Sequence, residues 1–236
     1  MGLLHTLTME FEVLPVTRYA QNCSILWCEK THRAAVIDPG GDISEIINFI
    51  ELMDLEPEVA LITHGHFDHA GGAAQFAELT GARIEGPHRA DEHVVEKLEE
   101  LGERYGIPSK NYIPSRWLEH GDRISFGQEI LEVLHCPGHC RGHVAYFSPT
   151  IRQAWVGDIL FRGSIGAWDH PDGDLPLLVR SIRSRLFPLG DDVAFVPGHG
   201  EQSTFGRERM HSPFVGEEAM KRWRKKFPAG GEPAIK

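Results

Sequence analysis

The ten residues Thr63–Gly72 constrain this chain more than any other stretch. Their sequence, THGHFDHAGG, holds three histidines and one aspartate within six residues and follows the apolar run 59–62. That run predicts a buried strand, and the glycines after the motif predict a turn into a helix. His64 and His66 lie on one side of an extended backbone, so both imidazoles can bind one metal ion.

Asp68 and His69 follow where the chain bends, and adjacent residues at a bend can face different directions. We therefore expect them to face a second ion rather than the ion held by His64 and His66. The alternative interpretation is a polar loop whose histidines are satisfied by hydrogen bonds. The density of donor residues favours a metal site with two ions.

Composition restricts the partners of such a site. The 236 residues are 41% hydrophobic, enough for an ordinary core, and carry a formal net charge of −10. This charge argues against nucleic acid or an anionic membrane as the main partner, because neither would meet a basic surface. Residues 1–16 lack the segments of a signal peptide or membrane span, and four cysteines are too few for a disulfide scaffold. We expect a cytoplasmic protein with Cys23 and Cys28 reduced.

Strand and helix patterns alternate along the chain and predict a layered α/β fold. Asp42 and Glu45 form the pattern of a capping box, and Asp174 and Thr204 are further predicted helix caps. The expected strands are 11–16, 23–27, 33–37, 59–62, 83–84, 123–126, 129–135, 143–147, 153–156 and 193–196, and the expected helices are 43–53, 73–79, 91–105, 175–186 and 204–211.

The order of these elements predicts two sheets packed between helices. No linker or repeat interrupts the chain, which predicts a single domain over 1–236 with its core at about 11–212. The tail 221–236 is basic and then rich in Gly and Pro, and is expected to fray.

Three later segments share one layout: an apolar strand ends in a small residue, which is followed by a residue of a type that binds metal. They read VLHCPGH, AWVGD and FVPGH, and they end in His139, Asp158 and His199. Side chains at strand ends collect in the active sites of layered α/β folds. Each segment alone is more typical of a simple turn, but with the first motif they supply seven candidate ligands.

With these motifs in order, the chain resembles the metallo-β-lactamase fold superfamily. The matching elements are H-x-H-x-D-H at 64–69 and the later His139, Gly-Asp158 and Gly-His199-Gly. The resemblance implies an αββα sandwich of two mixed β-sheets between helices, with metals in a groove at one edge of the sheets. Five imidazoles and two carboxylates suit zinc, and iron or manganese also accept such ligands. The implied ligands are His64, His66 and His139 for one ion, Asp68, His69 and His199 for the second, and Asp158 as the bridge.

The segment 138–143 leaves two alternatives open. The resemblance favours His139 over His143 as a ligand, and His143 is expected to make structural contacts at the start of a strand. Cys140 stands where relatives usually carry Thr, and its thiol either approaches a metal or is buried and inert.

The expected chemistry is acyl hydrolysis, because a water that bridges two divalent ions loses a proton near neutral pH. Asp68 would orient the resulting hydroxide and could take its proton. Within the superfamily the chain is most similar to glyoxalase II, the hydroxyacylglutathione hydrolases, through QNC at 21–23, DPGG at 38–41, CPGH at 136–139 and GDILF at 157–161. That family hydrolyses S-lactoylglutathione and related thioesters. The resemblance implies a small-molecule thioester substrate, and we expect a monomer or small homo-oligomer.

The substrate side of the site departs from glyoxalase II. Ala167 stands where relatives usually place a Lys or Arg that can meet the glutathione carboxylates, and the nearby Arg162 is either a substitute or a solvated arginine. Trp168 and His170 are expected to line the pocket instead. Only a short tail follows His199, as in compact bacterial type II glyoxalases, whereas two-domain glyoxalase II enzymes carry a helical C-terminal domain.

Three other functions fit the same motifs. Persulfide dioxygenases share the fold and bind a single iron through two histidines and an aspartate. A lactonase or other ester hydrolase is favoured by the sequence HFDHAG at 66–71. A binding or purely structural metal protein is the third. Metal content, oxygen uptake with glutathione persulfide, and a panel of thioesters, esters and lactones separate these functions.

Overall fold

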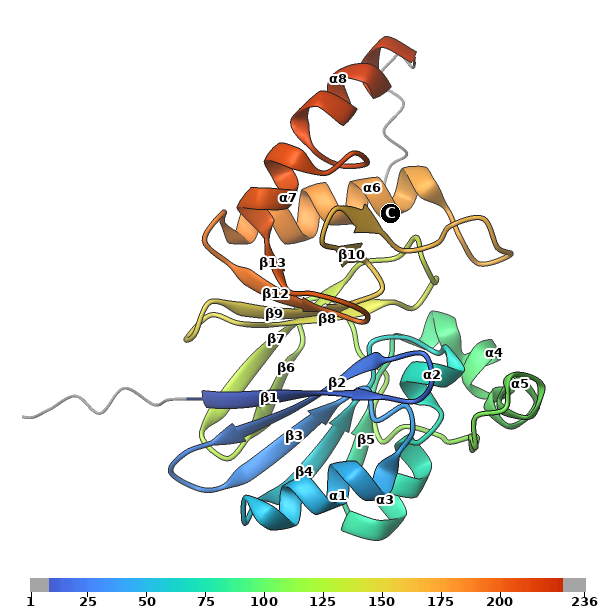
Figure 1. Cartoon of the computed structure of the whole chain (residues 1–236), viewed down its shortest axis with the longest axis vertical. Coiled ribbons are helices and arrows are strands. Elements are labelled where there is room, and N and C mark those ends of the chain that lie inside the picture. Colours follow the sequence, from blue (N-terminus) through green and yellow to red (C-terminus); the bar gives the residue numbers. More distant parts are fainter. Residues whose placement is uncertain (1–8, 227–236) are drawn as a thin grey trace, which may run out of the picture.

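The computed structural model describes residues 9–226, which form two facing β-sheets with helices on both outer faces (Figure 1). The first sheet has five strands in the order β1-β2-β3-β4-β5, and the second has six in the order β13-β12-β9-β8-β7-β6. The first sheet comprises β1 (Met9–Val16), β2 (Gln21–Cys28), β3 (Arg33–Ile37), β4 (Glu56–Leu61) and β5 (Arg83–Glu85). The second comprises β6 (Arg123–Phe126), β7 (Glu129–His135), β8 (Val144–Ser148), β9 (Gln153–Gly157), β12 (Ala194–Pro197) and β13 (Ser203–Thr204), and a separate hairpin pairs β10 (Leu160–Phe161) with β11 (Ser164–Ile165).

Both sheets are mixed. In the first, β1, β2 and β3 are antiparallel neighbours, whereas β4 and β5 continue in parallel. In the second, β6 to β9 are antiparallel, β12 is parallel to β9, and β13 is antiparallel to β12. The predicted αββα sandwich of two mixed sheets is confirmed.

Helices cover the outer faces and one end of the sandwich (Figure 1). The first sheet is covered by α1 (Ile43–Leu52) and α3 (Ala73–Thr80). The second is covered by α6 (Leu175–Ser181), the helical turns Ile182–Leu186 and Phe187–Leu189, and α7 (Phe205–His211), and α8 (Glu217–Lys226) lies farther out, beyond α6 and α7. At one end lie α2 (Phe67–Ala70), the turn Arg89–Asp91, α4 (Glu92–Val95) and α5 (Leu98–Tyr105). No helix in the part of the chain that the structure describes is long and apolar enough to cross a membrane.

The continuous apolar runs of the sequence arise because each sheet is covered on both faces. Successive side chains of a strand point to opposite faces, so Ile25 packs on the α1 side while Leu26 packs between the two sheets. In β4, Ala60 likewise packs on the α1 side and Leu61 packs between the two sheets. Burying a side chain such as Ile25 contributes about 1.5–3 kcal/mol. β4 is therefore held rigidly just before the histidine motif.

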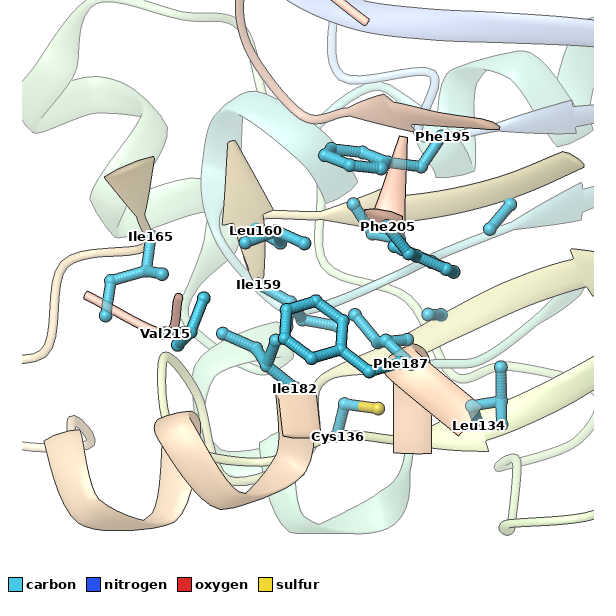
Figure 2. Packing of buried hydrophobic residues seen from close by; sticks show 14 of the residues in the cluster. Leu134, Cys136, Ile159, Leu160, Ile165, Ile182, Phe187, Phe195, Phe205 and Val215 are labelled. Atoms are coloured by element: carbon cyan, nitrogen blue, oxygen red, sulfur yellow. The ribbon is translucent and has the colours of Figure 1, made fainter. Parts of the chain in front are cut away.

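Buried apolar side chains on the helix-covered face of the second sheet form a cluster, here called the outer cluster, that holds β12 in place (Figure 2). Phe195 of β12 stacks on Phe205 of α7 with ring centroids 5.3 Å apart. Phe187 and Ile182 belong to the same cluster and come from the helical turns after α6. The strand end that leads to His199 is therefore fixed by aromatic packing.

Two predicted helix features are wrong. Asp42 precedes α1 but does not cap it, because its backbone is left-handed at φ 48° and its Oδ2 accepts the amide N–H of Thr17 at 2.6 Å. The helix predicted over 91–105 is broken between α4 and α5. The amide of Lys97 bonds to the carbonyl of Val94, three residues back, at 2.9 Å, and this tighter turn interrupts the α-helical pattern.

The C-terminal prediction is wrong for residues 221–226, which belong to α8 instead of fraying. Met220 of this helix is buried in the outer cluster and Trp223 packs against it, and these contacts hold the helix. Residues 227–236 of the predicted tail lie outside the described part of the chain. The strand predicted as the last, 193–196, is followed by the short β13. Asp174 and Thr204 cap their helices as predicted, accepting the amide N–H groups of Leu177 and Arg207.

Candidate metal centre

The seven candidate ligands come from the ends of four strands. His64 and His66 follow β4, and α2 directly afterwards carries Asp68 and His69. The second sheet adds one residue after each of three strands: His139 after β7, Asp158 after β9 and His199 after β12. The fold brings all seven side chains into one cluster, with donors from both sheets.

Three imidazole nitrogens meet in the first part of the cluster. Nδ1 of His66 lies 3.0 Å from Nε2 of His64 and 3.1 Å from Nε2 of His139. Zinc–nitrogen bonds of about 2.0–2.1 Å place two tetrahedral ligands about 3.3 Å apart. The spacing of these three nitrogens therefore fits one ion.

A second set of donors lies beside the first. Nε2 of His199 is 3.3 Å from Nε2 of His69 and 3.3 Å from Oδ2 of Asp68. Two imidazoles and a carboxylate at this spacing form a second candidate set of ligands.

The carboxylate of Asp158 lies between the two sets. Its Oδ1 is 3.4 Å from Nε2 of His69, and its Oδ2 is 3.8 Å from Nε2 of both His139 and His199. Oδ1 is buried and has no hydrogen-bond partner within the described residues. A buried carboxylate oxygen without a donor is costly unless a cation balances it, so the residues fit a metal centre.

Gly198 brings the backbone close to this carboxylate. A Cβ at this position would lie 2.1 Å from Oδ1 of Asp158 and 2.6 Å from Cε1 of His69. Only glycine fits there, which explains the glycine before His199.

The charges of the cluster also suit a cation. Burial holds the pKa of His64 well below its usual value, and burial together with His139 lowers the pKa of His66 to about 3. Both rings therefore stay neutral, which is the form that binds metal. Burial also opposes the charged form of His69, but the two carboxylates beside it outweigh burial and raise its pKa well above the usual value. This side of the cluster favours positive charge.

Asp38 orients the second set from outside the cluster, a role that the sequence did not reveal. Its Oδ2 accepts Nδ1–H of His69 at 2.8 Å and the hydroxyl of Thr63 at 2.6 Å. Its Oδ1 accepts the amide N–H of Thr63 at 2.7 Å. These bonds fix the ring of His69 so that Nε2 faces the cluster. The DPGG sequence signals only the turn, and no local pattern links Asp38 to His69.

Backbone carbonyls orient two further rings. Nδ1–H of His139 donates to the carbonyl of Ala167 at 2.7 Å, and Nδ1–H of His199 donates to the carbonyl of Tyr19 at 3.1 Å. The remote nitrogen of each ring is thus occupied, and Nε2 is left for the cluster.

His143, the competitor of His139, uses both ring nitrogens elsewhere. The amide N–H of Asp158 donates to its Nε2 at 3.0 Å, and its Nδ1–H donates to the carbonyl of Val144 at 3.0 Å. The ring stacks on His64 with centroids 4.4 Å apart. His139 therefore remains the candidate ligand, and His143 holds the backbone before Asp158.

Asp91 joins the two histidine loops, which the sequence also did not reveal. Its buried carboxylate accepts the amide N–H of Gly65 at 3.0 Å and that of Gly142 at 2.5 Å. Gly65 lies between His64 and His66, and Gly142 lies three residues after His139. One side chain thus fixes the distance between the two loops. We use the name clamp for Asp91.

The clamp should make stability depend on pH. Burial raises the pKa of Asp91 from 3.8 to about 6, in spite of the two amide donors. The Asp91 carboxyl loses its proton at a lower pH in the unfolded chain than in the folded protein. Between pH 3.8 and about 6 the folded protein therefore binds more protons, and its stability falls as pH rises through this range. The free energy of unfolding of the chelated protein, relative to Asp91→Asn, should fall by about 2 kcal/mol from pH 4 to pH 6. Urea titrations of both proteins measure this difference, and a difference that does not change with pH would contradict the assignment.

The sequence predictions for the rim of the centre concern Arg162, Trp168 and His170. Arg162 forms an ion pair with Glu201, and both side chains are exposed. Trp168 packs against Phe214 beside the outer cluster, and its place in the pocket stays a prediction. His170 does lie at the cluster. Its ring is 5.7 Å from His66 and 5.3 Å from His139, and its Nε2 is buried without a hydrogen-bond partner in the described chain.

The fold and the cluster define a class of αββα proteins with a histidine- and carboxylate-rich centre at the edge of two sheets. Residues 16–199 match the model of the metallo-β-lactamase superfamily. The hydroxyacylglutathione hydrolase GloC of Haemophilus influenzae is 39% identical over 213 residues, which cover 89% of this chain and all of that protein.

Two solved structures share the fold closely. The BLEG-1 B3 metallo-β-lactamase superposes with a TM-score of 0.80 at 30% identity, over 87% of this chain and 99% of that one. The TTHA1623 protein, crystallised in a di-iron-bound form, superposes with a TM-score of 0.78 at 32% identity, over 86% and 99%. The chain belongs to the metallo-β-lactamase superfamily. Family and donor cluster together mark it as a metal-binding hydrolase.

Proposed function

We propose that this protein is a dinuclear metallohydrolase of glyoxalase II type that cleaves 2-hydroxyacyl thioesters such as S-lactoylglutathione. The observation that carries the proposal is the convergence of two donor sets around the carboxylate of Asp158. The similarity to GloC, at 39% identity over its whole length, supports the thioester class.

Each donor set is proposed to hold one divalent ion. His64, His66 and His139 would hold the first, and Asp68, His69 and His199 the second, with Asp158 shared. Zinc suits these ligands, and iron or manganese also fit. The di-iron form of TTHA1623 supports the two-ion count. Bound there, two such ions would supply an activated hydroxide and an electrophile for a carbonyl oxygen.

The side chains around the centre would position the reactants. Asp68 is partly exposed, so its carboxylate is within reach of a water molecule. Burial opposes its ionisation, but His69 and His199 outweigh burial and lower its pKa, so it accepts a hydrogen bond from that water. His170 offers a buried nitrogen at the rim for a polar group of the acyl chain. Hydrolysis adds water across the thioester bond and releases a hydroxy acid and a thiol.

A substrate panel tests this proposal. Protein stripped with a chelator and supplied with two equivalents of Zn(II), Fe(II) or Mn(II) should hydrolyse S-lactoylglutathione, with loss of thioester absorbance. The same preparations are assayed with a lactone, a simple ester, a β-lactam and glutathione persulfide with an oxygen electrode. The thioester should have the highest kcat/KM.

Two outcomes would contradict the proposal. Absence of thioester turnover with all three metals would remove the glyoxalase II assignment. Oxygen uptake with persulfide by a protein that holds one iron per chain would instead identify a dioxygenase.

A further inference from the structure

The remote nitrogen of His66 has a partner unlike that of any other candidate ligand. In the other candidate histidines this nitrogen is hydrogen-bonded to oxygen. The oxygen belongs to a threonine hydroxyl for His64, a carboxylate for His69 and backbone carbonyls for His139 and His199. For His66 the partner is sulfur, because Sγ of Cys140 lies 3.3 Å from its Nε2.

The tautomer of His66 follows from the opposite side of its ring. Nδ1 faces Nε2 of His64 and Nε2 of His139 at 3.0 and 3.1 Å. To hold the proposed ion together, all three atoms would carry their lone pairs toward it. A neutral imidazole with a lone pair on Nδ1 carries its proton on Nε2. That proton would point at Sγ of Cys140.

We propose that Cys140 is a positioning residue whose sulfur accepts Nε2–H of His66 and so aims Nδ1 of that ring at the metal. Cys140 is 1% exposed, so its sulfur faces Nε2 of His66 out of contact with bulk solvent. Without this acceptor, Nε2–H would lose its hydrogen-bond partner, a loss that costs about 1–3 kcal/mol where the group is buried. The inference rests on the proposed metal centre and extends it to the one candidate histidine ligand whose remote nitrogen faces sulfur instead of oxygen.

Substitution of Cys140 separates this role from direct ligation and from simple packing. In Cys140→Ala the dissociation constant for Zn(II), measured by competition with a chromophoric chelator, should rise by about tenfold, the lower end for loss of such a partner. Cys140→Ser and Cys140→Thr restore an acceptor and should stay within about threefold of the unmodified protein. Cys140→Val repeats the test with a larger apolar side chain if the alanine variant does not fold.

Cys136→Ala is the matched control, because Cys136 is equally buried four residues away but belongs to the outer cluster. Its affinity for Zn(II) should not change. Thermal unfolding of the chelated proteins reports packing changes separately from metal affinity.

Cobalt substitution gives a readout that does not depend on activity. The Co(II) protein should show no sulfur-to-cobalt charge-transfer band, because the sulfur faces Nε2 rather than the ion. A band that disappears in Cys140→Ser would make Cys140 a ligand and overturn the inference, as would full affinity in both Cys140→Ala and Cys140→Val. If the unmodified protein binds no metal, the proposed centre itself fails; if it binds metal without thioester turnover, only the substrate assignment fails.

Discussion

Replacing Asp158 with alanine should remove both the metal and the activity. The carboxylate lies between the two donor sets, 3.4 Å from Nε2 of His69 and 3.8 Å from Nε2 of both His139 and His199. Without it, the two donor sets would lose the carboxylate that they share. We expect metal content to fall from two ions per chain to one or none, and kcat/KM to fall by about 10³-fold or more, as for loss of an electrostatic group at a reacting centre.

Metal analysis by mass spectrometry and thioester kinetics measure the two effects together. Asp158→Asn keeps the shape of the side chain and guards against a folding defect. Asp192→Ala serves as control, because Asp192 is exposed and its ion pair with Arg152 lies outside the cluster. Two ions per chain in Asp158→Ala would show that Asp158 does not bridge.

Replacing Asp68 with asparagine should reduce kcat more than it reduces metal content. Asn keeps an oxygen beside His199 but loses the charge that orients and deprotonates water. Loss of a positioned proton acceptor costs about 10²–10⁴-fold in rate. The first ion, bound by His64, His66 and His139, should remain.

Steady-state kinetics with metal analysis of the same preparation test this expectation. KM should change little, because Asp68 acts on water rather than on substrate binding. A kcat within about fivefold of the unmodified protein, well short of the expected loss, would show that Asp68 has no role in the chemical step.

Much of the fold could be predicted because buried strands leave local patterns. Apolar runs such as 59–62 marked the strands, and glycine turns marked their ends. The prediction of one continuous helix over 91–105 failed because the apolar spacing is helical on both sides of the break. The spacing carries no sign of the tighter turn at Lys97, whose amide bonds to the carbonyl of Val94.

The proximity of the seven candidate ligands could be predicted from the same local patterns. His64 and His66 follow β4, and His139, Asp158 and His199 each follow a strand of the second sheet, so position in the sequence indicates position in the fold. The partners of these residues were not predictable. Asp38 accepts from His69 across 31 residues, and Cys140 meets His66 across 74, without any periodic pattern.

The division of the donors between two sheets has a thermodynamic consequence. With the proposed ligands, each ion would cross-link the two halves of the sandwich, as a disulfide cross-links two segments. Unlike a disulfide, this link depends on the surroundings, because an ion at 100 times its dissociation constant adds about 2.7 kcal/mol to the folded state and a scarce ion adds little. The melting temperature of this protein would then report the free metal concentration of its medium.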